Sequence, residues 1–251
     1  TASGSVPRRD PTTKKLLFED DSCVVLVLIP GGTFWMGAQD DDPEKPNHDP
    51  GAYGDEAPVH EVTIKPFFLA KHECTQAQWK VLTGGETPSH FNTGDDALRR
   101  PVEQVSWEDC RKVLDEQGLS LPTEAQWEYA CRAGTTTPWW TGADESDLGE
   151  AAWYDANADR RTHPVGEKRA NPFGLHDVHG NVWEWCADHW HGSYESAPAD
   201  GRGWVDGGTG GRVFRGGSWY VYAGNARSAN RNRGPPSYRA LGVRPARPIT
   251  P

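Results

Sequence analysis

Glycine and proline interrupt the chain every few residues from Gly134 to the C-terminus, which is nearly half of its 251 residues. Both residue types end helices and strands, so this half of the chain predicts short strands joined by long loops. So much irregular backbone is unusual in a compact domain. We therefore expect the loops to be held by aromatic packing, by arginine–carboxylate pairs or by a metal ion.

Three helices are predicted in the first half of the chain from the residues that cap them. A hydroxyl side chain precedes an acid or amide by three residues at each start, and a glycine closes each end. The helix starts are Thr75 with Gln78, Ser106 with Asp109, and Thr123 with Gln126, and the closing glycines are Gly84, Gly118 and Gly134.

Strands are predicted at residues 24–29, 33–37 and 58–69, where apolar residues gather or alternate. Residues 39–53 are acidic and rich in Pro, Gly and Asn, which predicts a long loop. Residues 1–16 are basic and polar and predict a flexible tail or linker, and residues 17–251 predict a single α+β domain.

The charge of the chain excludes some classes of function. The net charge of −10 argues against a general nucleic-acid binder. From Gly201 onward, however, the chain holds nine Arg, no Lys and one acid, Asp206. These arginines either pair with carboxylates and aromatic rings inside the fold or form a surface for an acidic or planar partner.

No stretch approaches the roughly 20 apolar residues of a membrane span. The chain starts with Thr, so cytoplasmic and surface-displayed locations both stay open.

The five cysteines are Cys23, Cys74, Cys110, Cys131 and Cys186, and no two have metal-ligand or redox-motif spacing. We expect mainly reduced core residues, with one disulfide left open.

A series of motifs runs through the body of the chain in a fixed order. The most distinctive are Pro-Gly-Gly-Thr-Phe-Trp-Met-Gly at 30–37, Leu-Pro-Thr-Glu-Ala-Gln-Trp-Glu-Tyr-Ala at 121–130, Gly-Asn-Val-Trp-Glu-Trp at 180–185, Arg-Gly-Gly-Ser-Trp at 215–219 and Gly-Val-Arg at 242–244. Together they resemble the formylglycine-generating enzyme (sulfatase-modifying factor) family. The resemblance implies a C-type lectin fold, an α+β domain with few helices and much irregular loop.

Oxidases of that family hold copper with two cysteines that follow the Gly-Gly-Ser motif. The corresponding stretch here, residues 219–226, contains no sulfur. Soft thiolates are the ligands that select Cu(I), so we expect neither copper nor the oxidase reaction. The sequence assigns no catalytic residue.

The C-terminal segment is more similar to the variable proteins of diversity-generating retroelements, which share this fold. The resemblance implies a variable region at about 212–247 in which framework residues alternate with hypervariable ones. The implied framework residues are Arg215, Gly216, Gly217, Ser218, Trp219, Arg227, Ser228, Ala229, Arg231, Arg239, Gly242 and Arg244. The implied ligand-binding positions are Tyr220, Val221, Tyr222, Asn225, Asn230, Asn232, Gly234, Ser237, Tyr238 and Ala240.

Composition agrees with this interpretation. Diversity in such systems arises mostly at the adenines of Asn codons, and changing the first two bases cannot reach Glu, Lys, Met, Gln or Trp. None of these five occurs from Tyr220 to Leu241. Tyr, Ser, Asn and Gly are also the residue types of adaptable binding surfaces.

We therefore predict a non-catalytic protein that binds an unidentified protein or cell-surface ligand through this region. Three alternatives remain: an inert polar loop, an oxidoreductase of the formylglycine-generating type that uses other ligands, and a catalytically silent paralogue of such an enzyme.

A structural calcium site is also implied by the resemblance. Its ligands would be the side chains of Asp177 and Glu184 and the carbonyl groups of Gly180 and Val182, and oxygen ligands of this kind suit Ca²⁺. The alternative is that Glu184 pairs with a framework arginine and that Asp177 caps a turn.

Overall fold

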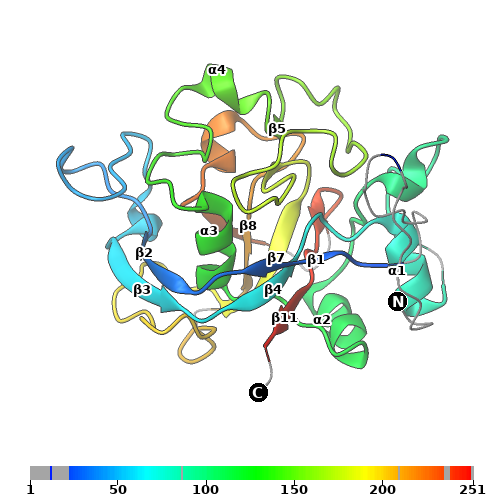
Figure 1. Cartoon of the computed structure of the whole chain (residues 1–251), viewed down its shortest axis with the longest axis horizontal. Coiled ribbons are helices and arrows are strands. Elements are labelled where there is room, and N and C mark those ends of the chain that lie inside the picture. The colour runs from blue at the N-terminus through cyan, green and yellow to red at the C-terminus, as the bar shows by residue number, and fades with distance from the viewer. Residues whose placement is uncertain (1–11, 13–22, 86, 209, 235–237, 250–251) are drawn as a thin grey trace.

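The computed structural model describes residues 12, 23–85, 87–208, 210–234 and 238–249. Short strands and helices are joined by long irregular segments, as expected for an α+β domain (Figure 1). The predicted tail at 1–16 falls almost entirely outside the described residues. The α-helices are α1 (Gln76–Thr83), α2 (Trp107–Glu116), α3 (Glu124–Arg132) and α4 (Glu145–Leu148), and the 3-10 helices are η1 (Gly54–Glu56), η2 (Ala97–Arg99) and η3 (Ala223–Ala226).

The three predicted helices form where their caps place them. The side chains of Thr75, Ser106 and Thr123 accept hydrogen bonds from the backbone N–H groups three residues later, at α1, α2 and α3. Gly84 ends α1 in the left-handed conformation. The helix α3 ends at Arg132, two residues before Gly134, and the intervening Ala133 caps it with a left-handed φ of 45°.

A bent antiparallel ribbon forms the front of the molecule in Figure 1. It pairs β1 (Leu26–Ile29) with β4 (Phe67–Ala70) and β2 (Gly32–Met36) with β3 (His60–Ile64). The single strand predicted at 58–69 is therefore wrong: it breaks at Lys65-Pro66, where proline cannot donate a ladder hydrogen bond. The C-terminal strand β11 (Ala246–Pro248) returns to pair with the other edge of β4.

A second, four-stranded sheet positions the candidate site. Its order is β10 (Leu241–Gly242), β7 (Trp183–His189), β8 (Arg212–Arg215) and β9 (Arg231–Arg233). The strands β10 and β7 are parallel, whereas β8 is antiparallel to both of its neighbours. The predicted variable region at 212–247 thus contributes three of the four strands, β8 and the two edge strands β9 and β10. A further small pair joins β5 (Ala152–Trp153) to β6 (His179–Gly180).

The cysteines are structural, as expected. All five are unpaired; Cys23 is partly exposed and the other four are buried. Burial raises the pKa of Cys74 and Cys131 to about 12, so these thiols stay protonated at neutral pH.

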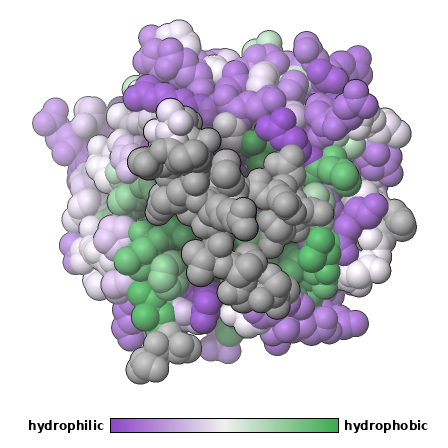
Figure 2. Space-filling model, turned by 45° about the vertical axis from the view of Figure 1, so that its right-hand side comes forward, coloured by the Kyte–Doolittle hydropathy of each residue, from purple (hydrophilic) through white to green (hydrophobic). Residues whose placement is uncertain are grey.

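On the face in Figure 2, hydrophilic side chains cover the periphery and hydrophobic ones gather toward the middle, beside the grey atoms. None of the helices in the described part of the chain has the length and apolarity to span a membrane.

Candidate functional site

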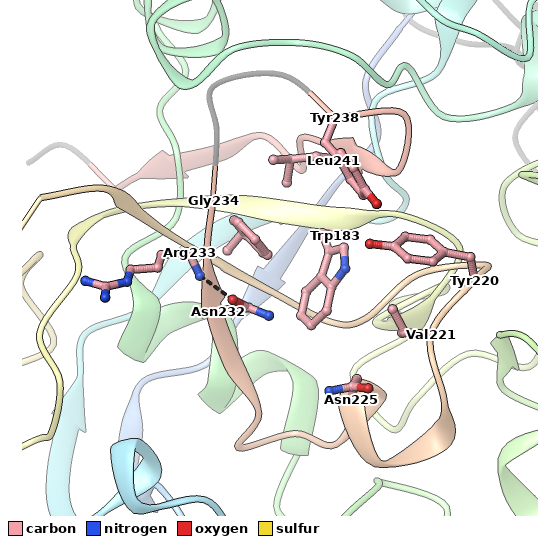
Figure 3. Close-up of a pocket in the computed structure, with 10 residues that line it drawn as sticks. Trp183, Tyr220, Val221, Asn225, Asn232, Arg233, Gly234, Tyr238 and Leu241 are labelled. Carbon is pink, nitrogen blue, oxygen red and sulfur yellow. Dashed lines mark hydrogen bonds between the residues drawn. The ribbon is translucent and has the colours of Figure 1, made fainter.

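Six of the ten predicted ligand-binding residues line one open pocket of about 300 Å³ (Figure 3). They are Tyr220, Val221, Asn225, Asn232, Gly234 and Tyr238. These residues come from the loop after β8, from η3, from β9 and from the turn before β10. The fold therefore gathers positions that are up to 18 residues apart in the chain into one concave surface.

The floor of the pocket consists of three apolar side chains from adjacent strands: Trp183 on β7, Phe214 on β8 and Leu241 on β10. Their exposed fractions are 3%, 7% and 1%. The Trp183 and Phe214 rings meet edge to face with centroids 5.1 Å apart. None of the three belongs to the predicted ligand-binding positions, so sequence reasoning missed the floor.

Two tyrosines form the upper wall. The rings of Tyr220 and Tyr238 lie 5.6 Å apart, and both hydroxyl groups point toward the pocket in Figure 3. Their exposed fractions are 37% and 40%. Burial raises the pKa of Tyr220, and its hydrogen bond with Tyr238 raises that pKa further. Tyr220 is therefore a neutral phenol at physiological pH.

The rim opposite the tyrosines is polar. Asn225 lies on η3 and is partly buried, whereas Asn232 is exposed on β9. The side-chain oxygen of Asn232 accepts the backbone N–H of Arg233 at 2.8 Å. In Figure 3 the Arg233 guanidinium points away from the pocket.

The remaining predicted positions behave differently. Tyr222 does not line the pocket and is 77% exposed, and Ser237 lies outside the described residues. Asn230 and Ala240 are 2% and 0% exposed, so the structure corrects both: neither side chain can contact a ligand. The Asn230 side chain instead donates to Glu56 at 3.2 Å, and Ala240 packs beside Trp219 in a small buried cluster.

Four framework arginines are buried and paired with carboxylates, as one of the two interpretations of the arginine-rich segment predicted. Arg215 contacts Glu128 and donates to two carbonyl groups, and Arg231 donates to both oxygens of Glu124 at 2.8 Å. Buried pairs of this kind are costly to break, because the remaining charge would be left without a partner.

The other two arginines bind the variable region to distant parts of the chain. Arg227 donates to Glu56 at 2.7 Å and to Asp49 at 2.9 Å. Arg244 donates to Glu184 at 2.7 Å. The irregular loops are thus held by ion pairs that span up to 178 residues of sequence.

Gly217, the second of the two framework glycines after Arg215, lies where only glycine fits without strain. Its φ is +78°, a conformation that favours glycine, and an added Cβ would lie 2.8 Å from Cα of Ala226. This close approach of Gly217 and Ala226 lets η3 pack against the end of β8.

Arg239 departs from the framework pattern. It is exposed and lies over the Trp219 ring at 5.5 Å, outside the buried arginine–carboxylate network.

The expected calcium ligands are close together but do not fit a cation site. Both oxygens of Glu184 accept hydrogen bonds from Arg244, and one also accepts the Trp127 indole N–H at 2.7 Å. A calcium ion would have to displace this guanidinium. The alternative interpretation, in which Glu184 pairs with a framework arginine, describes the geometry.

Asp177 differs from Glu184 because no arginine or lysine among the described residues forms an ion pair with it, although the charge of Arg244 is near enough to lower its pKa. One of its oxygens accepts the Gly166 N–H at 2.7 Å and the other is buried without a partner. Desolvation raises the pKa of Asp177 to about 6. Asp177 is also next to Glu73, whose two oxygens accept hydrogen bonds from Asn181 and Val182 and whose pKa burial raises. Partial protonation of the Asp177 and Glu73 carboxylates reduces the negative charge of this pair without a metal ion.

Comparisons with known proteins place the chain in a family. Residues 14–249 match the model of the sulfatase-modifying factor enzyme 1-like domain. The chain is 31% identical to the serine/threonine-protein kinase pkn1 of Chlamydia caviae over 84% of its own length, but it spans only 35% of that kinase. It is 28% identical to the formylglycine-generating enzyme of Thermomonospora curvata over 86% of this chain and 87% of the enzyme.

The structure is also similar to Treponema denticola variable protein 1, with a TM-score of 0.79 and 26% identity over 92% of this chain and 98% of that one. The α+β architecture is thus the C-type lectin fold of the formylglycine-generating-enzyme type, as expected. The chain belongs to the family of sulfatase-modifying factor enzyme 1-like domains.

Proposed function

We propose that this chain is a non-catalytic ligand-binding protein, the variable protein of a diversity-generating retroelement. The observation that carries the proposal is the division of the C-terminal region into two kinds of position. Six predicted variable residues line the pocket, whereas Arg215, Arg227, Arg231 and Arg244 are buried in ion pairs.

This division allows side chains to change without loss of the fold. Tyr220, Asn232 and Tyr238 are each at least one-third exposed and belong to none of the hydrophobic clusters, whereas Val221 packs partly buried against one of them. Substitutions at exposed positions usually change stability by no more than about 0.5 kcal/mol. The similarity to a variable protein of Treponema denticola supports the same interpretation.

The partner we propose is a protein or cell-surface ligand, because a shallow aromatic and amide-lined surface suits macromolecular recognition. Tyrosine provides rigid contact area, and asparagine provides adaptable hydrogen bonds. Tyr222, 77% exposed beside the pocket, would extend the contact beyond the cavity.

The second candidate is an oxidoreductase of the formylglycine-generating type, or a catalytically silent paralogue of one. The similarity to the enzyme of Thermomonospora curvata over most of both chains favours it. Against the oxidase, residues 219–226 hold no thiol, and Cys186, the last cysteine in the sequence, is buried with a pKa raised by desolvation. A protonated, enclosed thiol is a poor metal ligand and a poor nucleophile.

A library test separates the candidates. The five described pocket positions other than Gly234 (Tyr220, Val221, Asn225, Asn232 and Tyr238) are randomised and the library is selected against immobilised proteins; a control library randomises Asn230 and Ala240. We expect most members of the first library to fold and to yield specific binders, and most of the control library to unfold. Widespread unfolding in the first library would refute display. Copper-dependent oxygen consumption with a cysteine peptide would support the oxidase instead.

A further inference from the structure

The parts of the pocket that we do not expect to vary are apolar and basic. Trp183, Phe214 and Leu241 form the floor and belong to a buried hydrophobic cluster. Arg233 lines the rim, and Arg239 directly follows Tyr238 of the wall. Neither arginine nor any floor residue is a predicted ligand-binding position. Every variant of the protein would therefore offer its ligand the same apolar floor and the same two cationic side chains.

The segment that builds most of the pocket has no carboxylate side chain. The sequence contains no Asp or Glu after Asp206, and among the described lining residues only Arg233 is charged. The guanidinium of Arg233 points away from the cavity in Figure 3 and lies 5.2 Å from the centroid of the Trp190 ring. Arg233 therefore acts on the pocket through its charge, and no acid of the described lining offsets that charge.

Arg239 is placed to contact a ligand directly. It is exposed, unlike the four framework arginines that are buried in ion pairs, and its guanidinium lies 5.5 Å from the centroid of the Trp219 ring. The Trp219 ring in turn lies 5.1 Å from the ring of Tyr220 in the pocket wall. In the described part of the chain Arg239 forms no ion pair, so its N–H groups are open to a carboxylate on a ligand.

One acid lies beside the pocket and gives it a direction. Asp155 is exposed and donates its backbone N–H to the Val221 carbonyl at 3.2 Å. In Figure 3, Val221 lies below the Tyr220 ring and Tyr238 lies above it. A negative group of the ligand is therefore disfavoured at the Val221 end and favoured at the Tyr238 end, beside Arg239.

The confined extent of the positive region favours a short acidic segment over a long polyanion. Residues 201–251 contain nine of the 26 basic residues of the chain but only one of its 36 acidic residues. The rest of the chain is strongly acidic. A nucleic acid that extended beyond the pocket would meet this negative charge, whereas a few carboxylates on a protein would not.

We propose, on the basis of the display function above, that the pocket binds an acidic segment of the protein partner in which carboxylates flank an apolar side chain. The apolar side chain would pack on Trp183 and Phe214. A neighbouring carboxylate would accept hydrogen bonds from the Arg239 guanidinium, whose parallel N–H groups match its two oxygens. An apolar anchor with charged contacts at the rim is a common arrangement at protein interfaces.

The test compares four short peptides in NMR titrations of the folded protein. The probe is acetyl-Glu-Phe-Glu-amide. The Gln-Phe-Gln and Lys-Phe-Lys peptides change only the charge, and the Glu-Ala-Glu peptide removes the apolar side chain. A salt concentration of about 0.15 M limits the range of charge interactions to about 8 Å, so the arginines at the pocket outweigh the distant acids.

We expect the Glu-Phe-Glu peptide to bind about 2- to 5-fold more tightly than Gln-Phe-Gln, which is the range of one exposed ion pair. Lys-Phe-Lys should bind more weakly than both. Glu-Ala-Glu should bind at least about 5-fold more weakly than the probe, because it buries less apolar surface. Chemical-shift changes at the Trp183 indole N–H should locate the probe in the pocket.

Substitutions at Arg239 test the charge assignment. Arg239→Gln should abolish the preference for Glu-Phe-Glu and leave the affinity for Gln-Phe-Gln unchanged. Arg239→Lys keeps the charge and should retain most of the preference. Arg247→Gln is the matched control, because this exposed arginine on β11 does not line the pocket; it should leave the affinities for all four peptides unchanged.

Failure of Glu-Phe-Glu to bind, equal affinities for Glu-Phe-Glu and Gln-Phe-Gln, or a preference that persists in Arg239→Gln would overturn the acidic assignment. Tighter binding of a short oligothymidylate than of Glu-Phe-Glu would overturn it in favour of a phosphate ligand. The display function would survive any of these results if the library above still yielded protein binders, and both proposals would fall if it did not.

Discussion

The buried arginine network and the pocket wall are neighbours in sequence, yet they differ in burial and in the tolerance of substitution that we expect. Arg215 and Arg231 are fully enclosed and each contacts Glu124, whereas Tyr220 and Tyr238, on either side of Arg231 in sequence, are more than one-third exposed. The ion pairs of the network hold the backbone in place, so we expect replacement of these charged side chains to destabilise the fold. We expect replacement of the wall side chains to destabilise it much less. Under the proposed function, stability and recognition are thus assigned to different residues within one segment.

The largest effect should come from breaking the network at Arg215. Arg215→Ala removes one of the two arginine partners of the buried Glu128, the other being Arg132, and leaves two carbonyl acceptors without donors. Loss of one member of a buried ion pair costs about 3–5 kcal/mol. Chemical denaturation measures the change, and Arg239→Ala, at an exposed arginine, is the control. A similar small loss in both variants would contradict the division.

Removing the floor should be nearly as damaging. Trp183→Ala deletes a ring that is 3% exposed and packs on Phe214 and Leu241. Such truncations cost about 3–5 kcal/mol, and any value below about 2 kcal/mol would show that the pocket floor is not part of the core. Thermal unfolding followed by circular dichroism is a suitable measurement.

Glu103 is close to the pocket wall and should make stability depend on pH. The next residue, Gln104, donates its backbone N–H to the Tyr238 carbonyl. Desolvation raises the pKa of Glu103 to about 7, above the ordinary value of 4.5. The folded state therefore binds the proton more tightly, so this contribution to stability is complete below pH 4.5 and is lost as the pH rises through 7.

Glu103→Gln mimics the protonated form and should remove that loss. Relative to wild type, the variant should gain about 1–3 kcal/mol between pH 4.5 and 8. Urea denaturation at several pH values measures the difference, which isolates Glu103 from His72, whose lowered pKa of about 3 makes stability fall at acid pH. A stability difference that does not vary with pH would show that Glu103 stays ionised.

Smaller effects are expected at the wall. Tyr222→Ala should change the free energy of unfolding by less than about 0.5 kcal/mol, because the side chain is exposed. Tyr220→Ala should cost more, about 1 kcal/mol, since its ring contacts Trp219 and Tyr238. The melting temperatures of the two variants test the order, and a larger loss at Tyr222 would reverse it.

Calcium should have the smallest effect. Because Arg244 occupies Glu184, we expect calcium or a chelator to leave the melting temperature within about 1 °C of its value in plain buffer. A clear rise with calcium, absent in Glu184→Gln, would show that the ion can displace the guanidinium.

The sequence predicts local features of this fold well and distant pairings poorly. Capping residues define α1, α2 and α3 because a cap and its partner are three residues apart. The partners of the arginines cannot be read in this way: Arg227 and Glu56 are 171 residues apart, and only the folded chain brings them together.

The sequence predicted the location of the pocket but not its detail, and binding by its residues stays a prediction. The resemblance placed the variable positions, and six of them line the pocket. Asn230 and Ala240 directly precede β9 and β10, and their side chains are buried. Polar and apolar residues do not alternate regularly in this segment, so the sequence does not indicate which side chains point inward. The floor was missed because its three residues lie on three separate strands.

The order of elements along the chain has a consequence for variants that end early. Residues 220–240 precede Arg244 and the strand β11, which closes the front sheet against β4. A chain terminated by a stop codon among the pocket residues would lack the partner of Glu184 and the last strand together. We therefore expect such a truncated chain not to complete the fold, so that formation of the pocket depends on residues that follow it in the chain.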